Sequence, residues 1–203
     1  ANDSKIVNCY NLATISNSNG AAGGIIGSTV SDSEIIDCYN EGKINSSNNI
    51  AAGIAQSISN SKIFNCYNTG KIIGGVPAGG IVERASDSEI INCYNNGEIS
   101  GKYGSGGIVG DSLSNSKIIN CYNTGKIIDA DSSLGGILGK SITNSTLSKC
   151  YYLNSSAAQG VYNQKDIEGQ VEAKTQEVMQ SEEFVKQLNI NKDNTNAQIP
   201  LSN

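Results

Sequence analysis

The stretch Asn65-Cys66-Tyr67-Asn68-Thr69-Gly70-Lys71-Ile72 decides the fold, because close copies of it recur along most of the chain. A Cys-Tyr pair returns about every 28 residues, and Asn follows it in the first five copies. The cysteines are Cys9, Cys38, Cys66, Cys93, Cys121 and Cys150, and the tyrosines after them are Tyr10, Tyr39, Tyr67, Tyr94, Tyr122 and Tyr151. Self-similarity at one period is typical of repeat architectures in which each unit stacks on its neighbours.

A second motif, Gly followed by Ile, alternates with the first. It is clearest in Gly106-Gly107-Ile108-Val109-Gly110, and in the second unit it has drifted to Ala52-Gly53-Ile54-Ala55. Ser-x-Ile precedes each Cys, with Leu in place of Ile in the last copy. Three Ile-bearing segments separated by Asn, Gly and Ser predict three short strands joined by turns. Helices are a poor alternative, because these residue types have low helix propensity and form no helical apolar stripe.

These patterns predict an all-β fold, a parallel β-solenoid (β-helix) of about six coils with three short strands per coil. A unit of about 28 residues cannot bury its own apolar face. Stacking coils at roughly 4.8 Å buries that face against the next coil and pairs the backbone groups between coils.

A column of alternating charge supports the stacking. Four residues before the successive cysteines stand Lys5, Glu34, Lys62, Glu89 and Lys117, followed by Thr146. Opposite charges on neighbouring strands attract by ~0.2–1 kcal/mol per pair, so a stack favours this alternation. A second column, formed by Lys43, Lys71, Glu98 and Lys126, does not alternate.

The cysteines are interpreted as a structural core column. Equivalent residues on successive coils point in parallel, which keeps their Cβ atoms farther apart than the ~3.8 Å that a disulfide needs. Reduced thiols then act as small apolar core residues. Metal binding and a catalytic Cys are weaker readings, because the chain has no His and no Cys-x-x-Cys pair. No cofactor is expected.

We expect the Asn and Tyr columns to have roles different from that of the buried Cys column. Asn tolerates left-handed backbone geometry, so its column is expected at turns with amides hydrogen-bonded along the stack. The Tyr column is the candidate ligand-facing surface, since aligned rings can stack on sugars or pack against a partner. The plainer reading is that the rings cover the flank of the core.

After residue 154 the pattern stops. We expect the solenoid to span residues 1–154 and a C-terminal cap to span residues 155–203. The cap is predicted to contain a loop, a helix over about 175–189 and an extended tail from Ile190. Thr175 is the predicted N-cap, and Val178, Phe184, Val185 and Leu188 are expected on one face. The helix closes the open end of the stack; docking of a further domain is the alternative.

The repeat resembles a known bacterial family. Units of the form Asn-Cys-Tyr-Asn-Thr-Gly-Lys-Ile followed by Gly-Gly-Ile-Val-Gly are similar to the GLUG repeats of bacterial surface proteins, which also occur in proteases that cleave immunoglobulin A. The resemblance covers roughly residues 3–154, and Glu182 to Asn189 looks like the segment that commonly follows such arrays. It implies a bacterial protein that is extracellular or attached to the cell wall, with no activity of its own.

Composition narrows the function further. The net charge of −5 and the pI near 4.7 argue against nucleic acid as a partner, and no apolar run suits membrane insertion. The expected function is a non-catalytic surface module, an adhesin-like stalk or spacer that engages a host or cell-surface protein or glycan, with self-association left open. A carbohydrate-binding solenoid is the alternative. A polysaccharide-degrading enzyme is a weaker one, because its acids would have to come from the loose group Asp111, Asp129 and Asp131.

Overall fold

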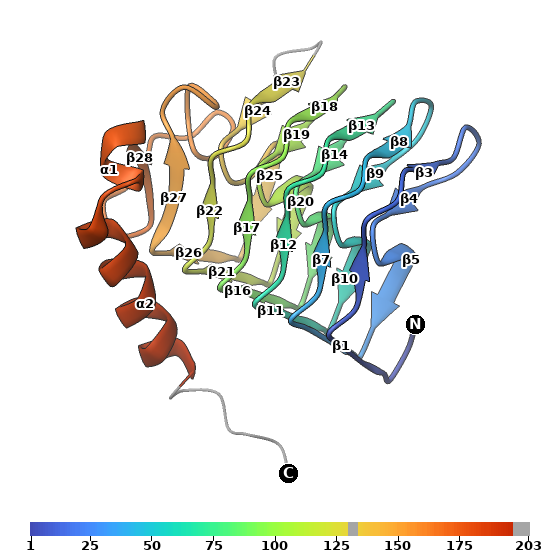
Figure 1. The fold of residues 1–203 in the computed structure, drawn as a ribbon, viewed down its shortest axis with the longest axis horizontal. Coiled ribbons are helices and arrows are strands. Elements are labelled where there is room, and N and C mark those ends of the chain that lie inside the picture. The colour runs from blue at the N-terminus through green and yellow to red at the C-terminus, as the bar shows by residue number, and fades with distance from the viewer. Residues whose placement is uncertain (130–133, 197–203) are drawn as a thin grey trace.

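A computed structural model describes residues 1–129 and 134–196 of the chain. The chain winds through stacked coils of short parallel strands, and a small helical segment lies at the C-terminal end (Figure 1). The all-β parallel solenoid predicted from the sequence is therefore confirmed. Each coil contributes one strand to each of five sheets, which run the length of the stack.

The strands are grouped below by sheet, in the order in which the chain visits the sheets. The first sheet contains β1 (Lys5–Val7), β6 (Glu34–Ile36), β11 (Lys62–Phe64), β16 (Glu89–Ile91), β21 (Lys117–Ile119) and β26 (Thr146–Ser148). The second contains β2 (Tyr10–Asn11), β7 (Tyr39–Asn40), β12 (Tyr67–Asn68), β17 (Tyr94–Asn95), β22 (Tyr122–Asn123), β27 (Cys150–Leu153) and β28 (Val171–Lys174). The third contains β3 (Ile15–Ser16), β8 (Ile44–Ser46), β13 (Ile72–Gly74), β18 (Ile99–Gly101) and β23 (Ile127–Asp129). The fourth contains β4 (Ala22–Gly23), β9 (Ala51–Ala52), β14 (Ala78–Gly79), β19 (Ser105–Gly106) and β24 (Leu134–Gly135). The fifth contains β5 (Ile26–Ser31), β10 (Ala55–Ser59), β15 (Val82–Ser86), β20 (Val109–Ser114) and β25 (Ser141–Thr143).

Two details of the prediction need correction. Each coil has five short strands instead of three, because corners interrupt segments that look continuous in the sequence. About five turns are complete instead of six. The sixth copy of the motif supplies only β26 and β27, and the chain leaves the coil path after Leu153.

The two corners beside the first sheet are made by residues with left-handed backbone. One column precedes the Ser of each unit and the other precedes the Cys. Their members are Asp3, Asp32, Asn60, Asp87, Asn115 and Asn144, and Asn8, Asp37, Asn65, Asn92, Asn120 and Lys149. Asn and Asp adopt positive φ more readily than other non-Gly residues. This explains why eleven of these twelve corner positions hold Asn or Asp, with Lys149 the exception. The Asn column predicted at turns lies elsewhere, in the strands of the second sheet.

Columns of Ile, Cys and Ala side chains fill the interior. A column of Gly residues leaves the space that the side chains of the Asn column occupy. The side chains of Ile35, Ile63 and Ile90 are fully buried. A Cβ built on Gly80 would collide with the carbonyl oxygen of Gly107 and would lie 2.7 Å from the Cβ of Asn95. The Gly-Ile motif is therefore tied to the Cys-Tyr-Asn motif, because the Gly leaves room for the Asn of the same stack.

The C-terminal segment holds two helices where one was expected. Thr175 caps α1 (Gln176–Met179), as predicted, and its hydroxyl accepts a hydrogen bond from the amide of Val178. The chain then breaks before α2 (Glu182–Asn196), and Ser181 accepts from the amide of Phe184 at 3.2 Å. The break separates Val178 from the face of Phe184, so Val178 is exposed and Phe184 is buried.

The predicted extended tail is also corrected. Residues 190–196 continue α2, because no Gly or Pro interrupts the helix there. Residues 197–203 lie outside the described part of the chain. The strand β28 was not predicted; it pairs with β27 in register, with Val171 opposite Cys150.

Candidate functional site

The Cys column lies inside the stack. Cys9 is exposed and the other five cysteines are buried, all as free thiols. The Sγ atoms of Cys38, Cys66, Cys93 and Cys121 each accept a hydrogen bond from the cysteine amide of the preceding coil, at 3.4 Å. Burial raises the pKa of the Cys66 and Cys93 thiols, and that of Cys150 to about 12. Thiols with raised pKa stay protonated at neutral pH, so Cys66, Cys93 and Cys150 are poor nucleophiles.

The Asn column is a buried chain of amide hydrogen bonds. Each Nδ2 donates to the Oδ1 of the next coil, at 2.7 Å from Asn40 to Asn68 and at 2.7 Å from Asn68 to Asn95. The same Nδ2 of Asn68 also donates to the carbonyl of Gly70 at 2.8 Å. At the C-terminal end, where Tyr152 replaces Asn, the Nδ2 of Asn123 donates to the hydroxyl of Ser156 at 3.3 Å. The column is structural, because its amide groups form hydrogen bonds with one another and with backbone carbonyls.

The tyrosine rings from Tyr10 to Tyr122 form a continuous stack. Successive ring centroids lie 5.3, 4.8, 4.9 and 5.0 Å apart, with interplanar angles of 11° or less. Each inner ring therefore has a neighbouring ring against both faces. A sugar that stacks on an aromatic side chain needs a free face, and the inner rings offer only edges and hydroxyls. This geometry does not favour the carbohydrate reading of the Tyr column.

Exposure of the Tyr column falls from the N-terminal to the C-terminal end. Tyr10 is 61% exposed and Tyr151 is 7% exposed. Burial raises the pKa of the Tyr94 phenol, and it raises that of Tyr122 to about 12. Tyr151 meets the ring of Phe184 edge-to-face at a centroid distance of 5.1 Å. The helix α2 thus covers the C-terminal end of this column.

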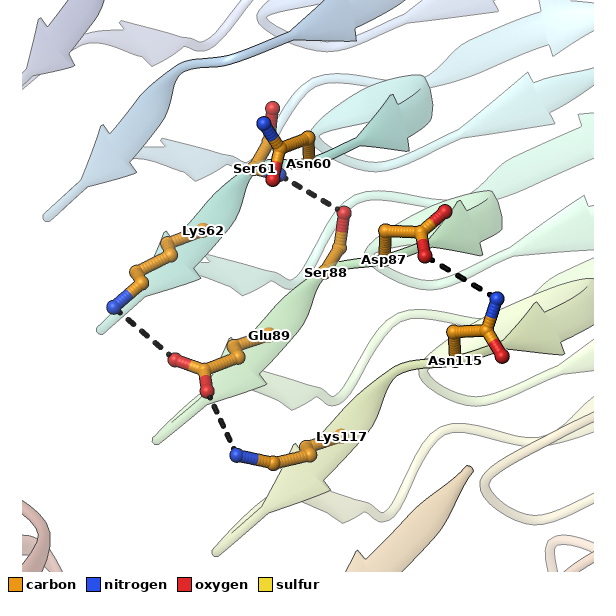
Figure 2. Close-up of a pocket in the computed structure, with 8 residues that line it drawn as sticks. All are labelled: Asn60, Ser61, Lys62, Asp87, Ser88, Glu89, Asn115 and Lys117. Carbon is orange, nitrogen blue, oxygen red and sulfur yellow. Dashed lines mark hydrogen bonds and ion pairs between the residues drawn. The ribbon is translucent and has the colours of Figure 1, made fainter. Parts of the chain in front are cut away.

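The charge column lies in register on the first sheet. Lys5 pairs with Glu34 at 3.4 Å. Glu89 pairs with Lys62 at 3.3 Å and with Lys117 at 3.2 Å (Figure 2). Burial alone raises the pKa of the Glu89 carboxyl, but the hydrogen bonds from Lys117 and Lys62 outweigh it and the pKa lies below its usual value. In the second column, Lys71 pairs with Glu98 at 2.7 Å.

The corner column beside these charges alternates from Asp32 to Asn115, which sequence reasoning missed. Asn60 donates to Asp32 at 2.6 Å, and Asn115 donates to Asp87 at 3.2 Å. The four middle coils therefore repeat in pairs, Ser-Asp-Ser-Glu on one and Ser-Asn-Ser-Lys on the next. Together the two columns line a shallow polar groove of about 240 Å³ around Ser88 (Figure 2). The signal was available in the sequence as a period of two units.

A second feature that sequence reasoning missed is a charged cluster at Glu83. The side chain of Glu83 is 1% exposed. The guanidinium of Arg84 lies 3.2 Å from the Glu83 carboxylate and 2.7 Å from the Asp111 carboxylate, so it bridges the two acids. Lys140 approaches Asp111 at 3.1 Å. Burial raises the pKa of Glu83 to about 7. The signal was that Glu83 stands where the preceding coil has Gln56, at a register shift between β15 and β20.

The acids proposed for an enzyme do not form one described group. Asp111 lies in β20 of the fifth sheet, and Asp129 ends β23 of the third sheet. Asp131 lies outside the described residues. Across the described part of the chain, no group of three or more His, Cys, Asp or Glu side chains is arranged to hold a metal ion.

We define the corner surface as two outward columns that flank the left-handed residues before the cysteines. The columns are Val7, Ile36, Phe64, Ile91 and Ile119 on the first sheet, and Tyr10, Tyr39, Tyr67, Tyr94 and Tyr122 on the second. Strand alternation places the first column opposite the buried Ile column, facing out. Val7 is 40% exposed, whereas Ile91 is 4% exposed. The corner surface is thus an apolar and aromatic strip that is most open on the first coils.

A comparison with known protein families matches part of the chain. Residues 18–45 match the family described as Glug, the GLUG motif. They run from the Gly-Gly-Ile motif at Gly23 through Cys38-Tyr39-Asn40 to Ile44, and this confirms the resemblance over one full repeat unit. No curated protein matches the chain. Among the described residues, none of the helices is both long enough and apolar enough to span a bilayer.

Proposed function

We propose that the chain is a non-catalytic repeat module of a bacterial surface protein, which acts as a stiff spacer and binds other proteins through its sides. The observation that carries the proposal is the register between coils. Tyr67 lies opposite Tyr39 and Tyr94, and Glu89 lies opposite Lys62 and Lys117, so one coil repeats the surface of the next. Backbone hydrogen bonds join coil to coil along all five sheets, which supports a stiff rod.

The corner surface supports the binding part of the proposal. Exposed apolar and aromatic side chains gather on its first coil, where Val7, Tyr10 and Leu12 are 40%, 61% and 60% exposed. Contiguous exposed apolar surface rimmed by charges is typical of protein interaction sites. The neighbouring charge column supplies such a rim through Lys5, Glu34 and Lys62.

The test compares variants in capture experiments. The purified chain is immobilised and exposed to bacterial envelope proteins and to host extracellular matrix proteins. We expect capture of a defined protein that is lost in the double variant Ile36→Glu/Phe64→Glu and kept in the control Ser57→Glu/Ser112→Glu on the fifth sheet. Capture that depends equally on both pairs, or no capture at all, argues against a binding role for the corner surface.

The surface location needs its own measurement. Antibodies against the chain, applied to fractions of the producing bacterium, should detect it in the wall fraction or the medium. Detection confined to the cytoplasmic fraction would remove the extracellular part of the proposal.

A further inference from the structure

The helix α2 packs beside the corner surface at the C-terminal coils. Its Phe184, 6% exposed, packs edge-to-face on Tyr151 at an interplanar angle of 82°. One turn later the backbone carbonyl of Leu188 accepts a hydrogen bond from the Nδ2 of Asn120 at 3.3 Å. The helix α2 therefore contacts two columns at once. Its Phe184 ring contacts the Tyr column, and its Leu188 carbonyl contacts the corner Asn column.

The same two columns continue on the first three coils. The column of Asn120 continues through Asn65 and Asp37 to Asn8, and the column of Tyr151 continues through Tyr67 to Tyr10. The second coil thus carries a carboxylate where the first and third carry an amide. Within the described part of the chain, the buried Oδ1 of Asn65 has no hydrogen-bond partner. The exposure of the Tyr column is greatest at this end.

We propose that the corner surface of the first three coils, around Ile36, Phe64 and Tyr39, binds an amphipathic α-helix of a partner protein. This deepens the proposed function by naming the kind of partner. The molecule already places a helix against this repeating surface at coils five and six, and the surface continues over the first three coils.

Dimensions and ring geometry fit a helix. Three coils span about 14 Å, which a helix of about ten residues covers. The stacked tyrosines present their edges. An incoming Phe can therefore meet them at near right angles, the angle at which Phe184 meets Tyr151. The bound helix would carry Phe and, one turn on, Leu, the spacing of Phe184 and Leu188 in α2.

The probe is a synthetic peptide with the sequence of residues 181–196, acetylated and amidated, added to the full chain. Nuclear magnetic resonance spectra of the labelled chain report which residues shift. We expect saturable shifts at Ile36, Tyr39 and Phe64. Phe64→Glu should weaken binding at least tenfold, Tyr39→Ala should weaken it severalfold, and Ser57→Glu should leave it unchanged. A peptide with Ala in place of its Phe should bind at least tenfold more weakly.

Several outcomes would overturn this. One is shifts confined to Asn120 and Tyr151, because the peptide would then only exchange with α2. Another is the absence of saturable shifts at millimolar peptide. A third is a dimer of the free chain that Phe64→Glu dissolves, since the occupant would then be a second copy. If capture through the corner surface persists while the peptide fails to bind, the helix proposal falls and the proposed function stands.

Discussion

Asn68 illustrates how a polar residue becomes part of a core. Its side chain is fully buried, donates to Asn95 and Gly70, and accepts from Asn40. No apolar residue can replace it without leaving buried amide groups on both neighbouring coils unpaired. The repeat therefore keeps Asn at this position for hydrogen bonding between coils.

We predict that Asn68→Ala lowers the free energy of unfolding by about 2–4 kcal/mol, because buried polar groups of Asn40, Gly70 and Asn95 each lose a hydrogen bond. Urea denaturation measures the change. The matched control is Asn11→Ala on the first coil, whose amide donates to Asn40 on the next coil; it should cost less than half as much. Equal losses at both positions would show that the column is not a cooperative chain.

Glu83 predicts how stability depends on pH. Its pKa is raised to about 7 by burial, from an ordinary value of 4.5. The folded chain therefore binds this proton more tightly than the unfolded chain, so the stabilising contribution is full below about pH 4.5 and is lost as pH rises through about 7. Arg84, Asp111 and Lys140 are the charged groups that act on it.

We expect the free energy of unfolding to be greater near pH 5 than near pH 8 by on the order of 1–3 kcal/mol from this group. Glu83→Gln should flatten that part of the profile and stabilise the chain near pH 8. Denaturation curves across this range measure both effects. A wild-type profile and a Glu83→Gln profile of the same slope would contradict the assignment.

At the scale of elements, the first sheet is joined by a charge column as well as by its backbone. Glu89 lies between Lys62 and Lys117, so Glu89→Lys would place three lysines in succession. We expect a lower melting temperature, equivalent to about 1–2 kcal/mol, and a smaller effect at high salt because screening weakens the repulsion. Glu168→Lys in an exposed loop is the control. An unchanged melting temperature of Glu89→Lys at low salt would count against this column.

The cap formed by α1, α2 and β28 protects one end of the stack. Phe184→Ala removes the contact with Tyr151 and should lower the free energy of unfolding by about 3 kcal/mol. Amide exchange in β28 should accelerate more than exchange in β12, because β28 is the last strand of the sheet. Val185→Ala, at a site 49% exposed, should change little. Uniform acceleration along all coils would mean that α2 does not act as a local cap.

Elements were predicted unevenly from the sequence. Stacking, the buried thiols' free state and the Thr175 cap depend on spacing and local chemistry, which the sequence contains. The division into five strands depends on corners at Asn65 and Asn60, and Asn has more than one role in each unit. The Glu83 cluster depends on a register shift between β15 and β20, which only the folded backbone reveals.

At the scale of the whole molecule, stability comes from contacts between neighbouring coils. Each coil is joined to the next by five short parallel ladders, a thiol column, an amide column and a tyrosine stack. Such a molecule has no single round core, and its sides repeat the same chemistry at one spacing. The helix α2 covers the corner surface at the C-terminal coils.

The most direct test of the account measures hydrogen bonds between coils. Scalar couplings across hydrogen bonds, detected by nuclear magnetic resonance, identify which carbonyl accepts from each amide. The account predicts that the amides of Tyr67, Tyr94 and Tyr122 couple to the carbonyls of Cys38, Cys66 and Cys93. Couplings to any other carbonyls, even one residue away, would contradict the stacking register on which the columns and the corner surface depend.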